Sequence, residues 1–297
     1  MKHIIGIDLG GSKMASGVVN TEGLVLRTVT EPTASFGREQ LIEQLVGVVK
    51  LLSEDMNVVA IGVGTPGFVD SQQGLVLLAT NLLGWTGVYL KRELEERLRG
   101  LPVVVENDAN VAALGEAWLG AGRDIESFLM LTLGTGVGGA IYSKHTELWR
   151  GANYRAGEFG HAILYPDGLP CGCGRRGCVE QYLSGRSLAR AYSEQSGNPS
   201  TAERVFALAN QGDTVALGVV QGFVRDLAVL LTSLQNMLDP TAFVLSGGLV
   251  SSREAWWQSL EQQLGSSGGE SVRILPAHLG NNAGVLGAAW LALRATQ

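Results

Sequence analysis

Hydrophobic residues in the first part of the chain form short apolar runs and longer stretches with helical spacing. Five runs bounded by glycine or polar residues predict β-strands, at residues 3–9, 14–19, 24–29, 58–63 and 103–106. Three stretches in which apolar residues recur every three or four positions predict helices, at 41–52, 88–99 and 109–119. This pattern predicts three consecutive strands followed by alternating helices and strands.

The second part of the chain repeats this theme. Strands are expected at 128–133, 140–143 and 242–245, and helices at 182–195, 202–210, 215–237, 253–264 and 282–295. An irregular stretch at 151–178 interrupts the second copy and is too long to be a simple connection. We therefore expect an internally duplicated chain with a functional insertion.

Composition narrows the class of protein. The 297 residues fit two domains better than one, and the net charge of -6 excludes the broad basic surface of a nucleic-acid-binding protein. The first apolar run is too short for a secretion signal, and no segment approaches the roughly 18 apolar residues of a membrane span. We expect a cytoplasmic protein with no nucleic-acid or membrane partner.

Two glycine turns are candidate phosphate-binding sites. In the first, backbone N–H groups and a serine hydroxyl can face a phosphate while an aspartate holds Mg²⁺ through water; its residues are Asp8, Gly10, Gly11, Ser12 and Lys13. The second turn lies at the equivalent point of the second copy and includes Gly134, Thr135 and Gly136. A plain glycine hairpin would explain either turn alone, but two turns at equivalent positions favour a site for a nucleoside triphosphate. Lys13 either adds positive charge there or faces solvent.

A third glycine turn follows the strand expected at 242–245. It contains Gly247 and Gly248. With the other two turns, it resembles the ATP site of the actin, Hsp70 and sugar-kinase superfamily, in which this turn would lie at the adenosine.

The junction of a strand and a helix at residues 106–110 has the sequence Glu-Asn-Asp-Ala-Asn. Asp108 fits two roles there: the N-cap of the helix, or a general base that accepts the proton of a sugar hydroxyl as it attacks the γ-phosphate. One side chain does not easily serve both roles, and Asn107 or Asn110 could supply the cap instead. The cluster is more polar than a cap requires, which favours catalysis.

All three cysteines fall within eight residues. His161, Cys171, Cys173 and Cys178, separated by ten, two and five positions, provide the four ligands of a tetrahedral zinc site. In a cytoplasmic protein such a cluster indicates metal rather than disulfides. Three buried cysteines and a surface histidine are the alternative, but that alternative leaves the clustering unexplained.

The stretch from Glu158 to Glu180 resembles the signature of the ROK family, a name that stands for repressors, open reading frames and kinases. The shared pattern is Glu-x-x-His at 158–161, then Cys-x-Cys-Gly-x-x-Gly-Cys-x-Glu at 171–180. The phosphate turns, the cluster at 106–110 and the Gly-Thr-Pro-Gly loop at 64–67 also lie where that family has theirs, so the resemblance covers essentially the whole chain.

The resemblance implies a role for each residue of a sugar site. Asp108 is implied as the general base, and His161 as a ligand of both sugar and zinc. The residues implied to contact the sugar or line its pocket are Gly67, Asn81, Asn107, Asp108, Glu158, His161 and Glu180. Tyr154 and Arg155 depart from the glycine or alanine that is common there in the glucokinases of the family.

The resemblance also implies a two-lobed actin-like, or ribonuclease H-like, α/β ATPase fold. Each lobe would carry a βββαβα unit, with ATP and sugar in the cleft between them. We expect an N-terminal lobe of residues 1–117 and a C-terminal lobe of residues 118–281 with a zinc-binding insertion at 151–180. The last helix, 282–297, is expected to pack back on the first lobe, and a homodimer or homotetramer is expected.

The expected activity is ATP-dependent phosphorylation of a hexose, with Mg²⁺ as cofactor and zinc as a structural ion. Glucose is favoured as the substrate, at the entry to glycolysis, because the segments 81–85 and 106–116 look most like those of bacterial glucokinases. Kinases for N-acetylglucosamine, N-acetylmannosamine or fructose are the alternative. A sugar-sensing repressor would carry a DNA-binding domain before residue 8, and an Hsp70-like ATPase a peptide-binding domain after the last helix.

Overall fold

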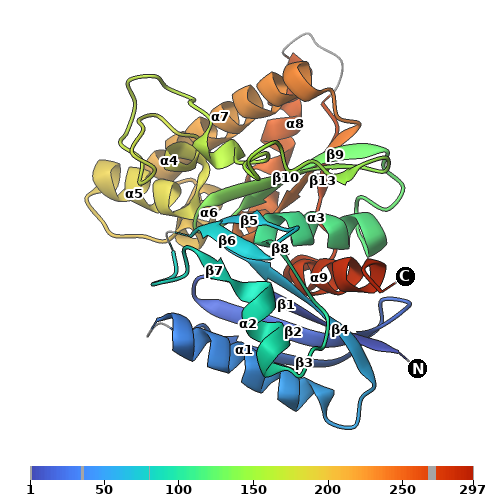
Figure 1. Cartoon of the computed structure of the whole chain (residues 1–297). Helices are drawn as coiled ribbons and strands as arrows, with labels where there is room; N and C mark the ends of the chain where they lie inside the picture. The colour runs from blue at the N-terminus through green and yellow to red at the C-terminus, as the bar shows by residue number, and fades with distance from the viewer. Residues whose placement is uncertain (1, 35–36, 80, 267–271, 297) are drawn as a thin grey trace. The chain divides into compact units, whose positions relative to one another are not determined.

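The computed structural model describes residues 2–34, 37–79, 81–266 and 272–296, which belong to two compact units (Figure 1). Unit 1 comprises Met1–Asp124, Ile141–Ala156 and His278–Gln297, and unit 2 comprises Ile125–Ala140 and Gly157–Ala277. These boundaries differ from the expected ones, because residues 118–124, 141–156 and 278–281 belong to unit 1. The chain therefore passes between the units four times.

A five-stranded sheet forms the centre of unit 1, in the order β3-β2-β1-β4-β8. Strand β1 pairs antiparallel with β2 and parallel with β4, which in turn pairs parallel with β8. The strands are β1 (His3–Leu9), β2 (Lys13–Asn20), β3 (Val25–Pro32), β4 (Val58–Thr65) and β8 (Val103–Asn107). The carboxyl ends of β1, β4 and β8 therefore meet at one edge, which brings Asp8 and Asn107 to the same side.

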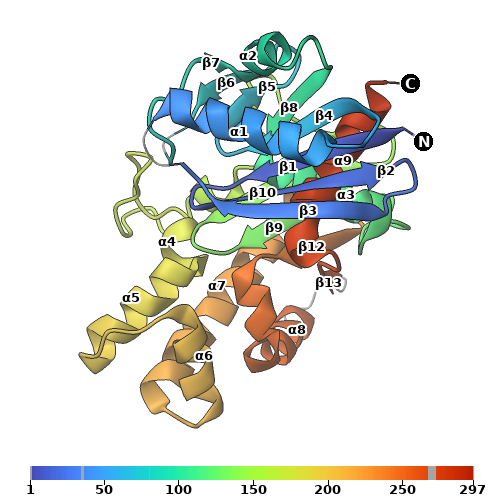
Figure 2. The ribbon, with the colours of Figure 1, turned by 90° about the horizontal axis from the view of Figure 1, so that it is seen from below.

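Helices cover both faces of this sheet, as Figure 2 shows. The helices are α1 (Arg38–Ser53), α2 (Leu90–Arg97), α3 (Asp108–Leu119) and α9 (Ala283–Arg294). Ile5 and Ile7 of β1 belong to the core under α1 and α2, whereas Ile4 belongs to the core under α9. This alternation is the period of two that a buried strand between two helical layers requires.

Helix α9 packs unusually close to the sheet. A Cβ atom at Gly6 of β1 would overlap the carbonyl oxygen of Val285, and one at Gly62 of β4 would overlap that of Ala288. The two glycines therefore allow the last helix to lie directly on β1 and β4.

The same strand order recurs in the second sheet, β11-β10-β9-β12-β13, which confirms the expected duplication. Its strands are β9 (Ser127–Leu133), β10 (Val137–Ser143), β11 (Glu147–Leu148), β12 (Ala242–Ser246) and β13 (Ile274–Pro276). Strand β10 runs from unit 2 into unit 1, where it pairs with β11. The sequence did not predict β11 or β13, which are too short to show a pattern of their own.

The helices of unit 2 begin and end differently from expectation at two points. They are α4 (Glu180–Leu183), α5 (Gly185–Ser196), α6 (Ala202–Asn210), α7 (Thr214–Leu238) and α8 (Trp257–Ser266). The helix expected at 182–195 is broken at Ser184, whose hydroxyl caps α5. The helix expected at 253–264 starts instead as a 3₁₀ helix, Gly248–Ala255, and Trp256 separates it from α8 because the indole is buried and donates to the carbonyl of Leu249.

A small antiparallel sheet in unit 1 was also not predicted. It contains β5 (Phe68–Asp70), β6 (Leu75–Leu78) and β7 (Val88–Tyr89), in that order. Because β7 takes the first two residues of the helix expected at 88–99, α2 begins only at Leu90.

Within the described residues, one helix is long and apolar enough to cross a membrane by length and composition alone. This helix is α7, with a mean hydropathy of 1.6 over its most apolar window, and it corrects the expectation that no segment approaches such a span. Of that window, 56% is buried, and α7 packs against α5, α6 and α8. A buried core helix gives the same signal, so it is weak evidence for a membrane.

Candidate functional site

In unit 1, the first glycine turn connects β1 to β2. The N–H of Gly10 donates to the carbonyl of Lys13 at 2.9 Å, and the Thr33 hydroxyl donates to the carbonyl of Gly10 at 2.7 Å. Gly11, Ser12 and Lys13 are exposed at the tip of this turn. Hydrogen bonds at Gly10 therefore hold the base of the turn, while its tip remains accessible to a ligand.

Two carboxylates lie close together beside this turn. Burial raises the pKa of Asp8 to about 7, and the nearby Asp108 carboxylate contributes to the rise, whereas Lys13 opposes it. Helix α9 closes the other side, since a Cβ atom at Gly284 would overlap the Asp8 carboxylate. Two acidic groups in a sheltered site with a single nearby lysine form a donor set suited to Mg²⁺.

Asn107, rather than Asp108, caps helix α3. Its side-chain oxygen accepts from the N–H groups of Ala109 and Asn110 at 2.9 and 3.1 Å. The Asp108 carboxylate also accepts from the N–H of Ala109, at 2.8 Å, and burial raises its pKa. The capping role is thus filled by the neighbouring amide, which leaves the carboxylate of Asp108 free for another role.

The amide group of Asn107 also fixes the loop after β4. It donates to the carbonyl of Gly67 at 2.9 Å, and Gly67 has a φ of 98°, a conformation that favours glycine. A carboxamide has two N–H donors, and the Asn107 side chain also forms a hydrogen bond with Asp108, which opposes the rise that burial causes in the pKa of that carboxyl. Asn81 is exposed and lies beside the phosphate turn, 3.9 Å from the position a Cβ atom would take at Gly11. Unit 1 therefore brings together all the residues that the sequence assigned to it.

Two further side chains, Arg150 and Tyr154, form hydrogen bonds close to this cluster. The Arg150 guanidinium donates to the carboxylate of Glu106 at 2.6 Å. Tyr154 forms a hydrogen bond with Asp70, which raises the pKa of the phenol. Both come from the segment after β11, and no local pattern in the sequence could have identified their partners.

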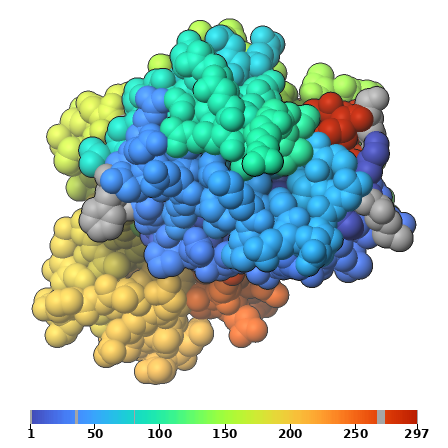
Figure 3. Space-filling view, turned by 60° about the horizontal axis from the view of Figure 1, so that its bottom comes forward, coloured from blue at the N-terminus to red at the C-terminus, as the bar shows by residue number. Residues whose placement is uncertain are grey.

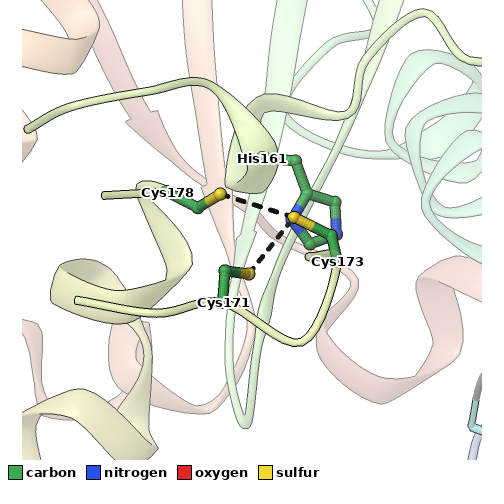
Figure 4. A group of neighbouring side chains, drawn as sticks. All are labelled: His161, Cys171, Cys173 and Cys178. Atoms are coloured by element: carbon green, nitrogen blue, oxygen red, sulfur yellow. Dashed lines mark hydrogen bonds between the residues drawn. The ribbon is translucent and has the colours of Figure 1, made fainter. Parts of the chain in front are cut away.

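In unit 2, His161 and the three cysteines converge, as Figure 4 shows. Their ligand atoms all lie within 4.8 Å of one another, with 3.7 Å between Cys171 Sγ and His161 Nδ1 and 3.6 Å between the sulfurs of Cys173 and Cys178. Zn–S bonds of about 2.3 Å at tetrahedral angles require sulfurs about 3.8 Å apart. The two pairs at 3.6 and 3.7 Å therefore match the spacing that a tetrahedral zinc ion requires.

The titration of two of these thiols is consistent with such a role. Burial raises the pKa of the Cys178 thiol to about 12, with the neighbouring sulfurs adding to the rise. Burial also raises the pKa of the Cys173 thiol, but hydrogen bonds with Arg175, Cys171 and Cys178 together outweigh it and lower that pKa to about 7. A bound divalent cation would be needed to ionise Cys178 at neutral pH.

The same cluster positions the carboxylates expected to bind sugar. Ile163 pairs with Cys178, and the N–H of Val179 donates to the carbonyl of Ala162 at 2.9 Å. Glu158 directly precedes the 3₁₀ helix Phe159–His161, which ends at His161, and Glu180 begins α4 two residues after Cys178. All three expected sugar ligands of unit 2 are therefore part of, or within three residues of, the His161–Cys178 cluster.

The second and third glycine turns also lie in unit 2. The carbonyl of Gly134 accepts from the N–H of Gly185 at 2.7 Å, while Thr135 is exposed at the tip. Gly247 has a φ of 93°, and a Cβ atom there would overlap the carbonyl of Leu133, the residue before Gly134. The structure therefore brings these two turns side by side, with Gly248 opening the 3₁₀ helix that follows.

Comparison with known proteins gives one consistent result. The sequence matches the ROK family over residues 4–295. It is 38% identical over 311 residues to a glucokinase of Streptomyces coelicolor, with 97% of this chain and 96% of that protein covered. It is 33% identical over 304 residues to an N-acetyl-D-glucosamine kinase of Photobacterium profundum, with 97% and 99% covered.

A solved structure agrees with both matches. The ROK family glucokinase from Streptomyces griseus, in complex with glucose and AMPPNP, has a TM-score of 0.85 and 37% identity to this chain, covering 98% of this chain and 99% of that one. This likeness confirms the two-lobed actin-like fold.

Proposed function

The chain belongs to the ROK family, and on this basis we propose that it is an ATP-dependent hexose kinase that phosphorylates glucose. The observation that carries the proposal is the capping of α3 by Asn107, which leaves the carboxylate of Asp108 available beside Asp8 and the first glycine turn. A kinase needs these elements together: a base, a carboxylate for Mg²⁺ and a turn that binds phosphate.

Asp108 acts as the general base in this proposal. Its carboxylate accepts the proton of the sugar hydroxyl as the oxygen attacks the γ-phosphate of ATP. Burial raises its pKa, which brings the basicity of the group closer to neutral pH, where a general base is most effective. Transfer of the phosphoryl group to the 6-hydroxyl yields glucose 6-phosphate and ADP.

The glycine turns hold the triphosphate. Backbone N–H groups at Gly11–Lys13 and at Thr135–Gly136 face the phosphates, and the turn of Gly247 and Gly248 lies beside the adenosine. Asp8 would hold Mg²⁺, and the ion would supply positive charge to the phosphate oxygens. These contacts stabilise the charge that develops on the transferred group.

The sugar is recognised by polar side chains of each unit. Unit 1 contributes Asn107, Gly67 and Asn81. Unit 2 contributes Glu158, His161 and Glu180, whose acceptors reject an epimer because a misplaced hydroxyl would leave a buried polar group unpaired. A structural zinc ion at His161, Cys171, Cys173 and Cys178 would hold that loop in place.

A second candidate substrate is an N-acetylhexosamine. The N-acetyl-D-glucosamine kinase of Photobacterium profundum covers as much of this chain as the Streptomyces coelicolor glucokinase does, at 33% rather than 38% identity. We also propose that the protein works in the cytoplasm as a homodimer or homotetramer. Exposed apolar side chains on the zinc-binding loop, such as Ile163 and Leu169, support self-association.

The function is tested with a panel of sugars in an assay for ADP release. Purified protein is given glucose, mannose, fructose, N-acetylglucosamine or N-acetylmannosamine with ATP and Mg²⁺, and light scattering during gel filtration measures the mass. We expect the highest kcat/KM for glucose. A higher value for an N-acetylhexosamine would reject glucose as the substrate and retain the kinase, whereas no turnover of any sugar would reject the kinase.

A further inference from the structure

Glu106 is a buried carboxylate at the end of β8, directly before the Asn107–Asp108 turn. Its side chain is 1% exposed. One oxygen, Oε1, accepts from the backbone N–H of Asn107 and from the side-chain amide of Asn110, both at 2.9 Å. The two donors lie on either side of Asp108 in the sequence. Glu106 therefore forms hydrogen bonds with a residue before Asp108 and with a residue after it.

The second oxygen of Glu106 has a partner far away in the sequence. Oε2 accepts from Nε of Arg150 at 2.6 Å, across 44 positions of the chain. The Arg150 side chain is 28% exposed, and its Nη1 also donates to the carbonyl of Leu148 at 3.4 Å. The charge of Glu106 is therefore paired, and both of its oxygens are hydrogen-bonded.

The segment that carries Arg150 is itself anchored in unit 1. The N–H of Ala156 donates to the carbonyl of Arg150 at 3.1 Å and closes the loop between them. Within this loop, Tyr154 is hydrogen-bonded to Asp70, and the Arg155 guanidinium lies 4.9 Å from the centre of the Phe68 ring. The loop that carries Arg150 therefore contacts β5 at two residues, Phe68 and Asp70.

A buried carboxylate is costly unless it is paired and hydrogen-bonded. An apolar residue at position 106 would pack at the end of β8 without that cost, yet it could not hold the N–H of Asn107 or the amide of Asn110. The specific consequence of a carboxylate here is the orientation of the two residues next to it. Catalysis depends strongly on such orientation, since a displacement of about 1 Å can reduce a rate by roughly 100-fold.

We propose that Glu106 is a positioning residue for phosphoryl transfer, and that its ion pair with Arg150 holds Asn107 and Asp108 in the orientation the reaction needs. This role rests on the proposed function, in which Asp108 is the base and Asn107 a ligand of the sugar. Glu106 itself touches neither the sugar nor the phosphate; it acts through its two neighbours.

Three single variants and one double variant test the pair. In Glu106→Gln, one donor contact must be lost, because an amide has only one acceptor oxygen where the carboxylate has two. In Arg150→Met, the buried carboxylate loses its cation, whereas Arg150→Lys keeps the charge. Each single neutral change is expected to lower kcat roughly 10- to 100-fold, and Arg150→Lys less. The double variant Glu106→Gln/Arg150→Met has no unpaired charge and is expected to lose no more than either single one.

The readout separates positioning from simple damage to the fold. Glucose-binding sites are counted by isothermal titration calorimetry, and kcat is expressed per binding site, so unfolded protein does not contribute. Positioning predicts that kcat per site falls while the glucose Kd changes only a few-fold. Should Glu106→Gln fail to fold, the two Arg150 variants still decide the question.

A matched ion pair on the outside of unit 1 serves as the control. Arg97 of α2 and Glu39 of α1 are 2.7 Å apart, and Figure 3 shows the exposed surfaces of α1 (blue) and α2 (teal) side by side. Arg97 also contacts Glu93 at 3.3 Å, so Arg97→Met removes a partly buried arginine as Arg150→Met does. It is expected to keep kcat within about twofold, because its partners lie on α1 and α2 and not at residues 106–110.

Three outcomes would contradict the proposal. The first is kcat per site within twofold of wild type in both Glu106→Gln and Arg150→Met. The second is losses that simply add in the double variant, and the third is an equal loss in Arg97→Met. In each of these outcomes the wild-type protein is still an active kinase, so only the role of the Glu106–Arg150 pair is rejected. An inactive wild-type protein would instead reject the proposed function on which that role rests.

Discussion

The carboxylate of Glu180 accepts a hydrogen bond from the backbone N–H of Val137 at 3.0 Å. This bond connects a residue proposed to bind sugar with the glycine turn proposed to bind phosphate, and both belong to unit 2. The proposed sugar-binding residue and the proposed phosphate-binding turn of unit 2 are therefore joined directly by the hydrogen bond between Glu180 and Val137.

Gly136→Ala should disturb sugar binding through this contact. The new Cβ atom would overlap the Glu180 carboxylate, which must then move and lose its bond to Val137. We expect the KM for glucose to rise about tenfold, equivalent to about 1.4 kcal/mol. The unfolding temperature should change little, because the end of a flexible side chain can yield.

Gly134→Ala is the matched control for Gly136→Ala. It lies in the same turn, but nothing stands within 4 Å of the new Cβ atom. It should leave the KM for glucose unchanged and affect only the KM for ATP. Equal glucose KM values for the two variants would contradict the link through Glu180.

Asp108→Asn should retain the fold and most of the sugar binding but lose turnover. The amide keeps the shape of the side chain but cannot accept a proton as a carboxylate does. General-base catalysis is typically worth roughly 10²- to 10⁴-fold in rate, so kcat should fall by that factor with a nearly unchanged Kd for glucose. A normal kcat in this variant would contradict the assignment of Asp108 as the general base and would leave it a structural role only.

Asp8→Asn should stabilise the protein at pH 8 when metal and nucleotide are removed with EDTA and dialysis. The pKa of Asp8 in the folded state, about 7, lies above the ordinary aspartate pKa of 3.8, so between these values the folded state binds a proton that the unfolded state does not. The wild type therefore loses stability as pH rises from about 4 to 7, by at most about 1.4 kcal/mol per pH unit.

Urea unfolding of wild type and Asp8→Asn at pH 5, 6, 7 and 8 measures this difference. The advantage of the variant should grow with pH and level off above 7. Asp124 is exposed and provides a control substitution, Asp124→Asn. This control should leave the pH dependence of the free energy of unfolding as it is in the wild type. A constant difference across the range would show that burial of the Asp8 charge does not control stability.

Metal analysis should find one zinc ion per chain. Structural zinc contributes on the order of 10 kcal/mol to folding at neutral pH, so Cys171→Ser or Cys178→Ser should lose the metal and much of the stability. Because Glu158 and Glu180 are attached to the same cluster, affinity for glucose should fall with it.

Chelation followed by addition of metal tests this coupling. Zinc should restore glucose binding, and Mg²⁺ alone should not. Fully active protein without zinc would refute the metal site, and unchanged glucose affinity after removal of zinc would refute only the coupling.

Much of the fold could be predicted because its signals are local. The apolar runs of β1, β4, β9 and β12, and the helical spacing of α1 and α7, lie within single segments, and each predicted element is present. The repeated pattern predicted the duplication, but the strand order of the two sheets was known only from the structure. The four metal-binding side chains also lie within 18 consecutive residues, so their common chemistry was visible before their geometry.

The short elements could not be predicted, because partners elsewhere in the chain decide them. Strands β5, β6 and β7 are stabilised by pairing with one another, whereas the local apolar spacing predicts the start of a helix at the two residues of β7. The break between α4 and α5 depends on Ser184, whose hydroxyl caps the second helix. Local propensity favours one helix there, and the tertiary contacts of Gly185 and Gly134 outweigh it.

The sequence by itself determined the family, the glycine turns and the candidate ligands of zinc and sugar, because each is a short pattern of residue types with a chemical meaning. Only the tertiary structure decided which residue caps α3, what pairs with Glu106, and what satisfies Glu116. The buried carboxylate of Glu116 accepts from the N–H groups of His278 and Leu279, more than 160 positions away. Buried polar groups must find hydrogen-bond partners, and the sequence shows that need without showing which distant residue meets it.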